Sequence, residues 1–236
     1  MCGIFGSKQF HTYEKLYLNN KQRGSFAGGS LYVGHNESMY IKKWEGVKQP
    51  QELTGEYILT DSYHTYLGHT QAPTGSVREF NSKTTHPFEH GRWIVAHNGV
   101  LENHELVREE YLSDSTGEYK GSVYDCSHIP VDSAVIPALL DTIFFKMADD
   151  VFAITEVMST LKGTFACWMH NKQTGQTYVV RSGSTLYGDI ENNIFSSIKV
   201  PGVAEQPLDE GVIYCVTPEG LTRVGSFHQS SPFFLF

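Results

Sequence analysis

The second residue of the chain is a cysteine, within the opening segment MCGIFG. Removal of Met1, which a small second residue permits, would place the Cys2 thiol and a free α-amine on the same terminal residue. An α-amine has a reference pKa of about 7.7–8, so it can take up the thiol proton near neutral pH. The segment therefore predicts a nucleophile that carries its own base. A buried cysteine in an apolar strand is the alternative that position alone leaves open.

A second segment, AHNGVLEN at residues 96–103, brings two hydrogen-bond donors together. Asn98 and Gly99 follow the apolar run 93–96. Asn-Gly is a common hairpin turn, which is one interpretation, but the residues that follow are typical of a helix. We expect a turn at the end of a strand, with the Asn98 amide and the Gly99 N–H aimed at one point. Two such donors would stabilise a developing oxyanion.

These two segments resemble the class II glutamine amidotransferase domain, a member of the N-terminal-nucleophile (Ntn) hydrolases. Further segments agree with the family in order and spacing, and the similarity covers about residues 2–225. A single motif of this kind is weak evidence, but several in the same order are specific. The further segments are QRGSFAG at 22–28, LGHT at 67–70, THPF at 85–88, VDS at 131–133, LKGTF at 161–165 and VRSG at 180–183.

The resemblance implies a mechanism. Cys2 would attack the side-chain amide of glutamine, with its α-amine as general base and then as general acid for the leaving nitrogen. Asn98 and the Gly99 N–H would hold the oxyanion, ammonia would leave, and water would release glutamate from a γ-glutamyl thioester. Asp132 would bind the substrate α-ammonium through a charge-assisted contact, and Arg23 would order the region around the nucleophile.

The sequence departs from the family after Thr70. The family has an arginine where this chain has Gln71, and that arginine would pair with the substrate α-carboxylate. Glutamine donates hydrogen bonds without charge, so we expect weaker binding, by about a few kcal/mol in a dry site. Thr74 matches a family threonine that contacts the same carboxylate. Arg78, in an expected glutamine-covering loop from residue 72 to about 83, is our hypothesis for the missing charge; an exposed Arg78 and a substrate without a free α-carboxylate are the alternatives.

Three histidines fall in the matching segments, namely His69, His86 and His97. We do not expect any of them to be the catalytic base, because the α-amine already fills that role. Imidazoles at strand ends more often satisfy backbone groups. His86 is placed with the residues of the substrate-binding side.

The elements that must position these residues are mostly short strands. The chain reads as strands, then helices, then strands again, which predicts an α+β fold; the resemblance implies a four-layer αββα sandwich of two stacked antiparallel sheets, of the Ntn-hydrolase type. We expect one domain over residues 1–236. The strands are expected at 2–7, 30–33, 39–44, 57–59, 66–70, 93–97, 164–170, 177–181, 193–196 and 212–217.

Helices are expected in the middle of the chain. A short one begins at Asn103, and a stronger one opens at Asp132, which could cap its N-terminus. Pro137 falls inside this second run, so the helix is either kinked there or starts later. Residues 151–161 have helical spacing, and Gly163 ends that run.

Composition limits the classes of function. The net charge is −8 and no basic block occurs, so direct binding of nucleic acid is not expected. No run approaches about 18 apolar residues, so no membrane span is expected. The 4 cysteines include no CxxC pair, and no metal or cofactor is expected. Wide cysteine spacing and the lack of a signal peptide favour reduced thiols in a cytoplasm.

The glutamine amidotransferase segments take up nearly the whole sequence. We therefore expect ammonia to pass to a separate acceptor synthetase. A free-standing hydrolase of other γ-glutamyl amides is the main alternative, and a non-catalytic scaffold is a third. The apolar tail, residues 226–236, is either a docking peptide through Phe233–Phe236 or a segment that folds back onto the protein.

Overall fold

The computed structural model describes residues 2–35, 38–48, 52, 62–72, 80–112 and 131–229, with the backbone alone for 144–147. All of the described strands belong to two sheets, and their paired strands are antiparallel. One sheet has seven strands in the order β11-β9-β10-β1-β4-β2-β3. Their bounds are Gln206–Pro207 for β11, Tyr187–Asp189 for β9, Ile194–Ser196 for β10, Gly3–Ser7 for β1, Tyr63–Gln71 for β4, Ala27–Gly34 for β2 and Met39–Glu45 for β3.

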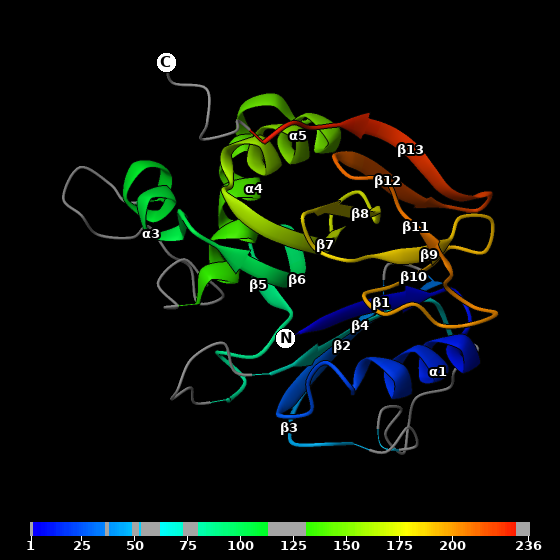
Figure 1. The fold of residues 1–236 in the computed structure, drawn as a ribbon. Coiled ribbons are helices and arrows are strands. Elements are labelled where there is room, and N and C mark those ends of the chain that lie inside the picture. Colours follow the sequence, from blue (N-terminus) through cyan, green and yellow to red (C-terminus); the bar gives the residue numbers. More distant parts are fainter. Residues whose placement is uncertain are drawn as a thin grey trace.

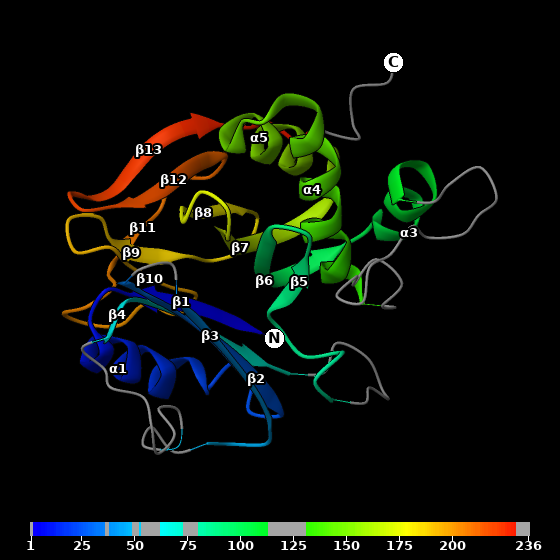
Figure 2. The ribbon, with the colours of Figure 1, turned by 180° about the vertical axis from the view of Figure 1, so that it is seen from behind.

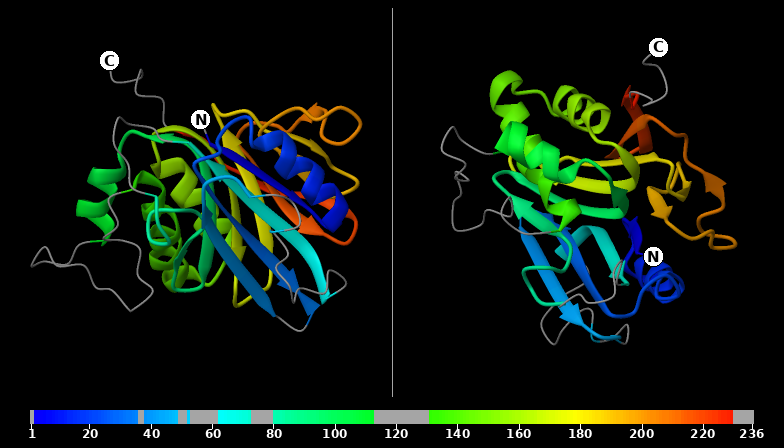
Figure 3. Two further views of the ribbon diagram at one scale, coloured as in Figure 1. Left: turned by 90° about the horizontal axis from the view of Figure 1, so that it is seen from below. Right: turned by 60° about the vertical axis from the view of Figure 1, so that its left-hand side comes forward.

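The other sheet has six strands in the order β13-β12-β8-β7-β6-β5. It lies face to face with the first sheet (Figure 1), and Figure 3 shows the same stacking from two further directions. Strand β1 is therefore central in its sheet and faces the other one. The bounds are Gly220–Ser226 for β13, Val212–Thr217 for β12, Thr177–Ser182 for β8, Gly163–Asn171 for β7, Trp93–Leu101 for β6 and Phe88–His90 for β5.

Helices cover the two outer faces. Helix α1 (Phe10–Asn20) lies on the seven-stranded sheet, and α4 (Val135–Met147) and α5 (Asp150–Thr160) lie on the six-stranded sheet (Figure 2). A short helix, α3 (His104–Val107), runs into a π-helical turn at Arg108–Leu112. The layers follow the order helix, sheet, sheet, helix, so the predicted α+β sandwich is confirmed.

Strand periodicity explains the layers. Successive side chains of a strand point to opposite faces, and here both faces are buried. In β1, Ile4 joins the apolar layer between the sheets, whereas Phe5 packs under α1. In β7, Trp168 joins the same middle layer, whereas Cys167 and Met169 pack under the helices.

Helix α1 is an element that the sequence analysis did not predict. Its buried residues are Tyr13, Leu16, Tyr17 and Asn20, at the i, i+3, i+4, i+7 spacing of one helical face. This face packs on Phe5 in the apolar cluster of that side. The helical spacing was therefore present in the sequence. The helix was missed because it follows immediately on a strand and because the Gln9 side chain makes no capping hydrogen bond at its N-terminus.

A proline sets the start of α4, and a side-chain cap sets the start of α5. A 3-10 turn at Asp132–Ala134 precedes α4, so Pro137 falls in the first turn of the helix, where its missing N–H breaks no bond. The later start is thus the alternative that holds. The Asp132 carboxylate does not cap α4 as expected, because it is engaged elsewhere. Helix α5 has the usual side-chain cap, with Asp149 accepting from the Phe152 N–H at 2.9 Å.

Most of the expected strands are confirmed within one to four residues at each end. The strand expected at 57–59, Thr74, Arg78 and the tail Phe233–Phe236 lie outside the described residues. In the described part of the chain, no helix has both the length and the apolar composition needed to cross a bilayer.

A buried histidine makes the fold sensitive to acid. His170 is 1% exposed and lies on the middle-layer face of β7, with its Nδ1 2.9 Å from the Thr177 hydroxyl. Burial, aided by His64 and Lys172, lowers its pKa from 6.5 to about 4. The folded state therefore favours the neutral ring, and the stability that this contributes is lost as pH falls from 6.5 through 4.

We predict that His170→Gln flattens the fall in the free energy of unfolding between pH 6.5 and 4, by about 3 kcal/mol. Urea unfolding followed across that range measures the slope. His11→Gln, at an exposed position on α1, is the matched control and should leave the wild-type slope in place. An unchanged slope in His170→Gln would show that other groups carry the acid sensitivity.

Candidate active site

Cys2 lies immediately before β1 and is 7% exposed. Its Sγ is 3.7 Å from the carbonyl oxygen of Ala72, the residue that follows β4. Gly3 pairs with Thr70 across β1 and β4, so the two strands end together at this point. Strand alternation puts Cys2 on the same side as Ile4, which faces the six-stranded sheet. The thiol thus lies at the edge of the middle layer.

Arg23 connects the segment at Cys2 to the end of β10. Its Nε donates to the Cys2 carbonyl at 2.7 Å, and its Nη1 donates to the Ser197 carbonyl at 3.2 Å and to the Thr185 hydroxyl at 3.0 Å. Burial lowers the pKa of Arg23, although nearby Cys2 raises it. This is the position from which a side chain can order the nucleophile strand, and that role stays a prediction.

The strand that bears Asn98 and Gly99 does not end at them. Strand β6 continues to Leu101, and Gly99 pairs with Phe165 of β7, so the expected strand-end turn is wrong. A continuous ladder with β7 outweighs the local turn preference of Asn-Gly. Gly99 has φ 156°, and a Cβ there would lie 1.9 Å from the Thr164 carbonyl oxygen, so only glycine fits this close pairing.

The register of β6 sets the direction of the Gly99 N–H. The Glu102 N–H donates to Lys162 O at 2.9 Å on the β7 side, whereas the Leu101 N–H donates to Asp132 Oδ2 at 3.0 Å on the other side. Backbone N–H groups alternate along a strand, so the Gly99 N–H points to the same side as that of Leu101. It is directed toward the side of β6 on which the Asp132 carboxylate lies.

Asp132 is held by backbone groups. Its Oδ2 accepts from Leu101 N–H, and its Oδ1 accepts from the Ser133 N–H at 2.8 Å and the Ser133 hydroxyl at 3.1 Å. Burial alone would raise the pKa of Asp132, but His97 and these hydrogen bonds together lower it. The group is therefore a carboxylate at neutral pH. Carboxylates offer about four acceptor positions, so these contacts leave capacity on Oδ2 for a cation.

His97 supports this arrangement from β6. Its Nδ1 lies 2.8 Å from the Ser133 hydroxyl, which in turn lies 3.1 Å from Asp132 Oδ1. Burial lowers the pKa of His97, so its ring is neutral at pH 7. The chain of contacts joins the strand that bears Asn98 to the turn that bears Asp132. These contacts give His97 a structural role, and its exclusion as the catalytic base stays a prediction.

Gln71 is fully buried at the end of β4. Its Nε2 lies 3.4 Å from the Thr84 carbonyl oxygen, and its Oε1 lies 3.4 Å from His86 Nδ1. The His86 ring lies against the His69 ring, tilted by 30° with 3.9 Å between centroids, and the Nε2 of His69 lies 3.1 Å from the His97 carbonyl oxygen. The Gln71 amide is thus engaged within the protein, and contact of Gln71 or His86 with substrate stays a prediction.

Ser197 is the residue of this region that the sequence analysis missed. Its hydroxyl oxygen accepts from the Ile4 N–H at 3.0 Å and from Asn98 Nδ2 at 3.1 Å. The residue is 1% exposed. It follows the expected strand 193–196, but nothing in the local sequence SSIKV distinguishes it from an ordinary strand-end serine.

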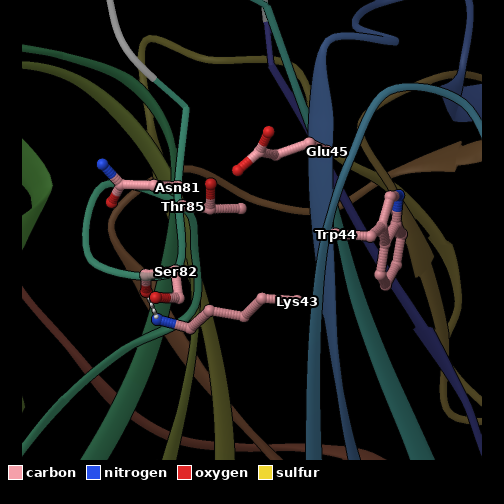
Figure 4. Close-up of a pocket in the computed structure, with 6 residues that line it drawn as sticks. All are labelled: Lys43, Trp44, Glu45, Asn81, Ser82 and Thr85. Atoms are coloured by element: carbon pink, nitrogen blue, oxygen red, sulfur yellow. Dashed lines mark hydrogen bonds between the residues drawn. The ribbon is translucent and has the colours of Figure 1, made fainter.

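A pocket of about 320 Å³ lies between β3 and the segment that precedes β5. Lys43 and Glu45 extend from β3 toward Asn81, Ser82 and Thr85, and Trp44 lies on the opposite side of the strand (Figure 4). Lys43 Nζ donates to the Ser82 carbonyl at 2.9 Å and so ties the two walls together. Among the described side chains, no three of His, Cys, Asp or Glu are grouped so that they could hold a metal ion.

The sequence has relatives among characterised proteins, although no family model matches it. Glutamine–fructose-6-phosphate aminotransferase (isomerizing) of Staphylococcus epidermidis is 27% identical over 192 residues, which are 79% of this chain and 30% of that protein. The protein of the same name in Listeria innocua is 28% identical over 234 residues, 94% of this chain and 36% of that protein. The chain spans about a third of the length of these relatives.

Solved structures share the fold. The glutamine phosphoribosylpyrophosphate amidotransferase of B. subtilis has a TM-score of 0.68 and 17% identity, covering 97% of this chain and 50% of that one. A glutamine aminotransferase class-II domain protein of Silicibacter pomeroyi has a TM-score of 0.53 and 12% identity, covering 96% of this chain and 99% of that one. In sequence, the chain is similar to these glutamine-dependent aminotransferases, and in fold it is similar to these amidotransferase structures, so it resembles the class II glutamine amidotransferase domains.

Proposed function

We propose that this chain is a glutaminase that supplies ammonia to a separate acceptor enzyme. After removal of Met1, the Cys2 α-amine takes the thiol proton, and the sulfur adds to the side-chain carbonyl carbon of glutamine. The C–N bond then breaks, the α-amine returns the proton to nitrogen, and ammonia leaves. Water attacks the resulting γ-glutamyl thioester, which releases glutamate and regenerates the thiol.

The observation that carries this proposal is the hydrogen-bonded link between the nucleophile strand and Asn98. The Ser197 hydroxyl accepts from the Ile4 N–H, two residues after Cys2, and from the Asn98 amide. The second N–H of that amide and the Gly99 N–H are the two donors that we assign to the oxyanion. Donors that are already oriented need no rearrangement when charge develops, which is why such sites are effective.

Asp132 supplies the proposed binding group for the substrate α-ammonium. Its carboxylate is ionised at neutral pH and retains acceptor capacity on Oδ2. It lies on the side of β6 to which the Gly99 N–H points. The two ends of one glutamine molecule would thus be held along the same strand.

The acceptor of the ammonia lies outside this chain in the proposal. The names of the relatives pair glutamine with fructose 6-phosphate or with phosphoribosylpyrophosphate. A second candidate function, hydrolysis of other γ-glutamyl amides, is favoured by one observation. Gln71, which replaces a family arginine, is neutral and its amide is engaged with Thr84 and His86.

The proposed nucleophile predicts a specific labelling pattern. We expect the intact mass of the purified protein to lack Met1 and to increase by one adduct after treatment with a glutamine-analogue electrophile. Cys2→Ser should lose the adduct and at least about 10²-fold in glutaminase turnover, because a hydroxyl is a far weaker nucleophile at neutral pH. Cys167→Ser, at a fully buried thiol, is the control and should label as the wild type does. Full turnover by a protein that still carries Met1 would contradict the mechanism.

Substitution of the α-ammonium ligand predicts a change in substrate binding. Asp132→Asn keeps an oxygen that can accept from the Leu101 N–H but removes the charge, so KM for glutamine should rise about 10- to 100-fold. Steady-state kinetics with glutamine measures this. The control is Asp141→Asn, another buried carboxylate, which accepts from Arg92 Nε at 2.9 Å. Asp141→Asn should lower stability and leave KM unchanged; equal effects on KM would remove Asp132 from the substrate site.

The missing family arginine predicts a role for Arg78. If Arg78 pairs with the α-carboxylate, Arg78→Ala should raise KM for glutamine about 10-fold or more. It should leave turnover of a γ-glutamyl amide without an α-carboxylate unchanged. Comparing the two substrates in wild type and variant measures both. An unchanged KM for glutamine in Arg78→Ala would reject the hypothesis, and faster wild-type turnover of the second substrate would favour the hydrolase function.

A further inference from the structure

Three segments that are distant in the sequence meet at Ser197. Its hydroxyl accepts from Ile4 N–H and Asn98 Nδ2, at sequence separations of 193 and 99 residues. Its carbonyl accepts from Arg23 Nη1 and from the Thr185 hydroxyl at 2.9 Å. The nucleophile strand, the strand with Asn98 and the loop with Arg23 are therefore joined through one residue that is 1% exposed.

The pairing of Ile4 with Ser197 lacks one of the two backbone hydrogen bonds of a regular ladder. Phe5 pairs with Ser196, so the register puts Ile4 opposite Ser197, and the Ser197 N–H donates to Ile4 O at 2.9 Å. In a regular antiparallel pair the Ile4 N–H would donate back to the Ser197 carbonyl. Here it donates to the Ser197 hydroxyl instead, because that carbonyl is occupied by Arg23 and Thr185. The hydroxyl is thereby held in a fixed place beside Asn98.

A fixed hydroxyl fixes the whole Asn98 carboxamide. A primary amide is planar and its nitrogen carries two N–H groups. When one N–H is bound to Ser197, the direction of the other is determined. The amide is 3% exposed, so no competing contact with bulk water reorients it.

We infer that Ser197 is a positioning residue for the oxyanion donor Asn98, and so acts on turnover rather than on glutamine binding. The inference rests on the proposed function. Ser197 touches neither Cys2 Sγ nor Asp132 in the described contacts, so the binding of the α-ammonium does not depend on it. Ser197 affects the reaction only by orienting the second N–H of the Asn98 amide.

The first test separates kcat from KM. Removing an entire oxyanion donor costs about 10²–10³ in kcat, so Ser197→Ala, which leaves the donor present but unaligned, should lower kcat about 10- to 100-fold. KM for glutamine should stay within about 2-fold. Ser197→Thr keeps the hydroxyl, and even if the added methyl lowers Tm, kcat should stay within about 3-fold of wild type.

The matched control is the neighbouring serine. Ser196 is also fully buried, and its hydroxyl accepts from Asn20 Nδ2 at 2.9 Å and from Ile198 N–H at 3.2 Å rather than from Asn98. Ser196→Ala should therefore lower Tm by a similar amount to Ser197→Ala while leaving kcat at the wild-type value. Equal losses of kcat in the two variants would reduce Ser197 to a structural residue and overturn the inference.

A double-mutant cycle tests the route through Asn98. In an Asn98→Ala background, Ser197→Ala should cost at most about 2-fold in kcat, because the group that it positions is already absent. A full 10- to 100-fold loss in that background would show that Ser197 acts through β1 instead.

A readout that needs no activity separates the inference from the proposed function. The two side-chain amide protons of Asn98, assigned by their loss in Asn98→Asp, should exchange slowly in the wild type, and Ser197→Ala should speed their exchange about 10-fold or more. If the wild type neither turns over glutamine nor labels at Cys2, the proposed function fails. The exchange measurement then still decides whether Ser197 holds the amide, and unchanged exchange would overturn the inference.

Discussion

The apolar layer between the two sheets is the interaction on which the site depends. Ile4 of β1 packs in the same cluster as Ile94 and Ala96 of β6. A shift of β1 by one residue would turn Ile4 outward and Phe5 inward, which would expose or displace large buried side chains on both faces. Packing therefore sets the register of β1 beneath β6. Because Cys2 directly precedes β1 and Asn98 lies two residues after Ala96 on β6, the same packing fixes where the proposed nucleophile and the proposed oxyanion donor lie.

Burial imposes the second constraint, since polar groups at the site need partners from the protein. Arg23 donates hydrogen bonds to the carbonyl oxygens of Cys2 and Ser197, and Asp132 accepts one from the Leu101 N–H. These contacts hold the segments at Cys2 and Ser197 and the Asp132 carboxylate in place within the protein itself. A site built from fixed dipoles in a dry setting is the arrangement that stabilises a developing oxyanion most strongly.

The departure at Gln71 is consistent with the same principle. In a buried position beside Thr84 and His86, a neutral amide satisfies two neighbours without bringing in a charge. An arginine there would need a carboxylate, from the substrate or from the protein, to offset its desolvation. The neutral residue thus lets the strand end be stable without bound substrate, and under the proposed function it moves the recognition of the α-carboxylate to other residues.

Local patterns in the sequence determined a large part of this protein. Short β-rich runs bounded by turn residues predicted most strands, and the ordered segments that begin at Cys2 indicated the fold and the family that the chain resembles. Helix α1 was missed although its apolar residues have helical spacing. The continuation of β6 through Gly99 and the contacts of Ser197 could not be predicted from the sequence. Pairing with β7 decided the first, and contacts across 193 and 99 residues decided the second. Such contacts form only when the sheets stack, so the residues around a position do not indicate which distant group it will contact.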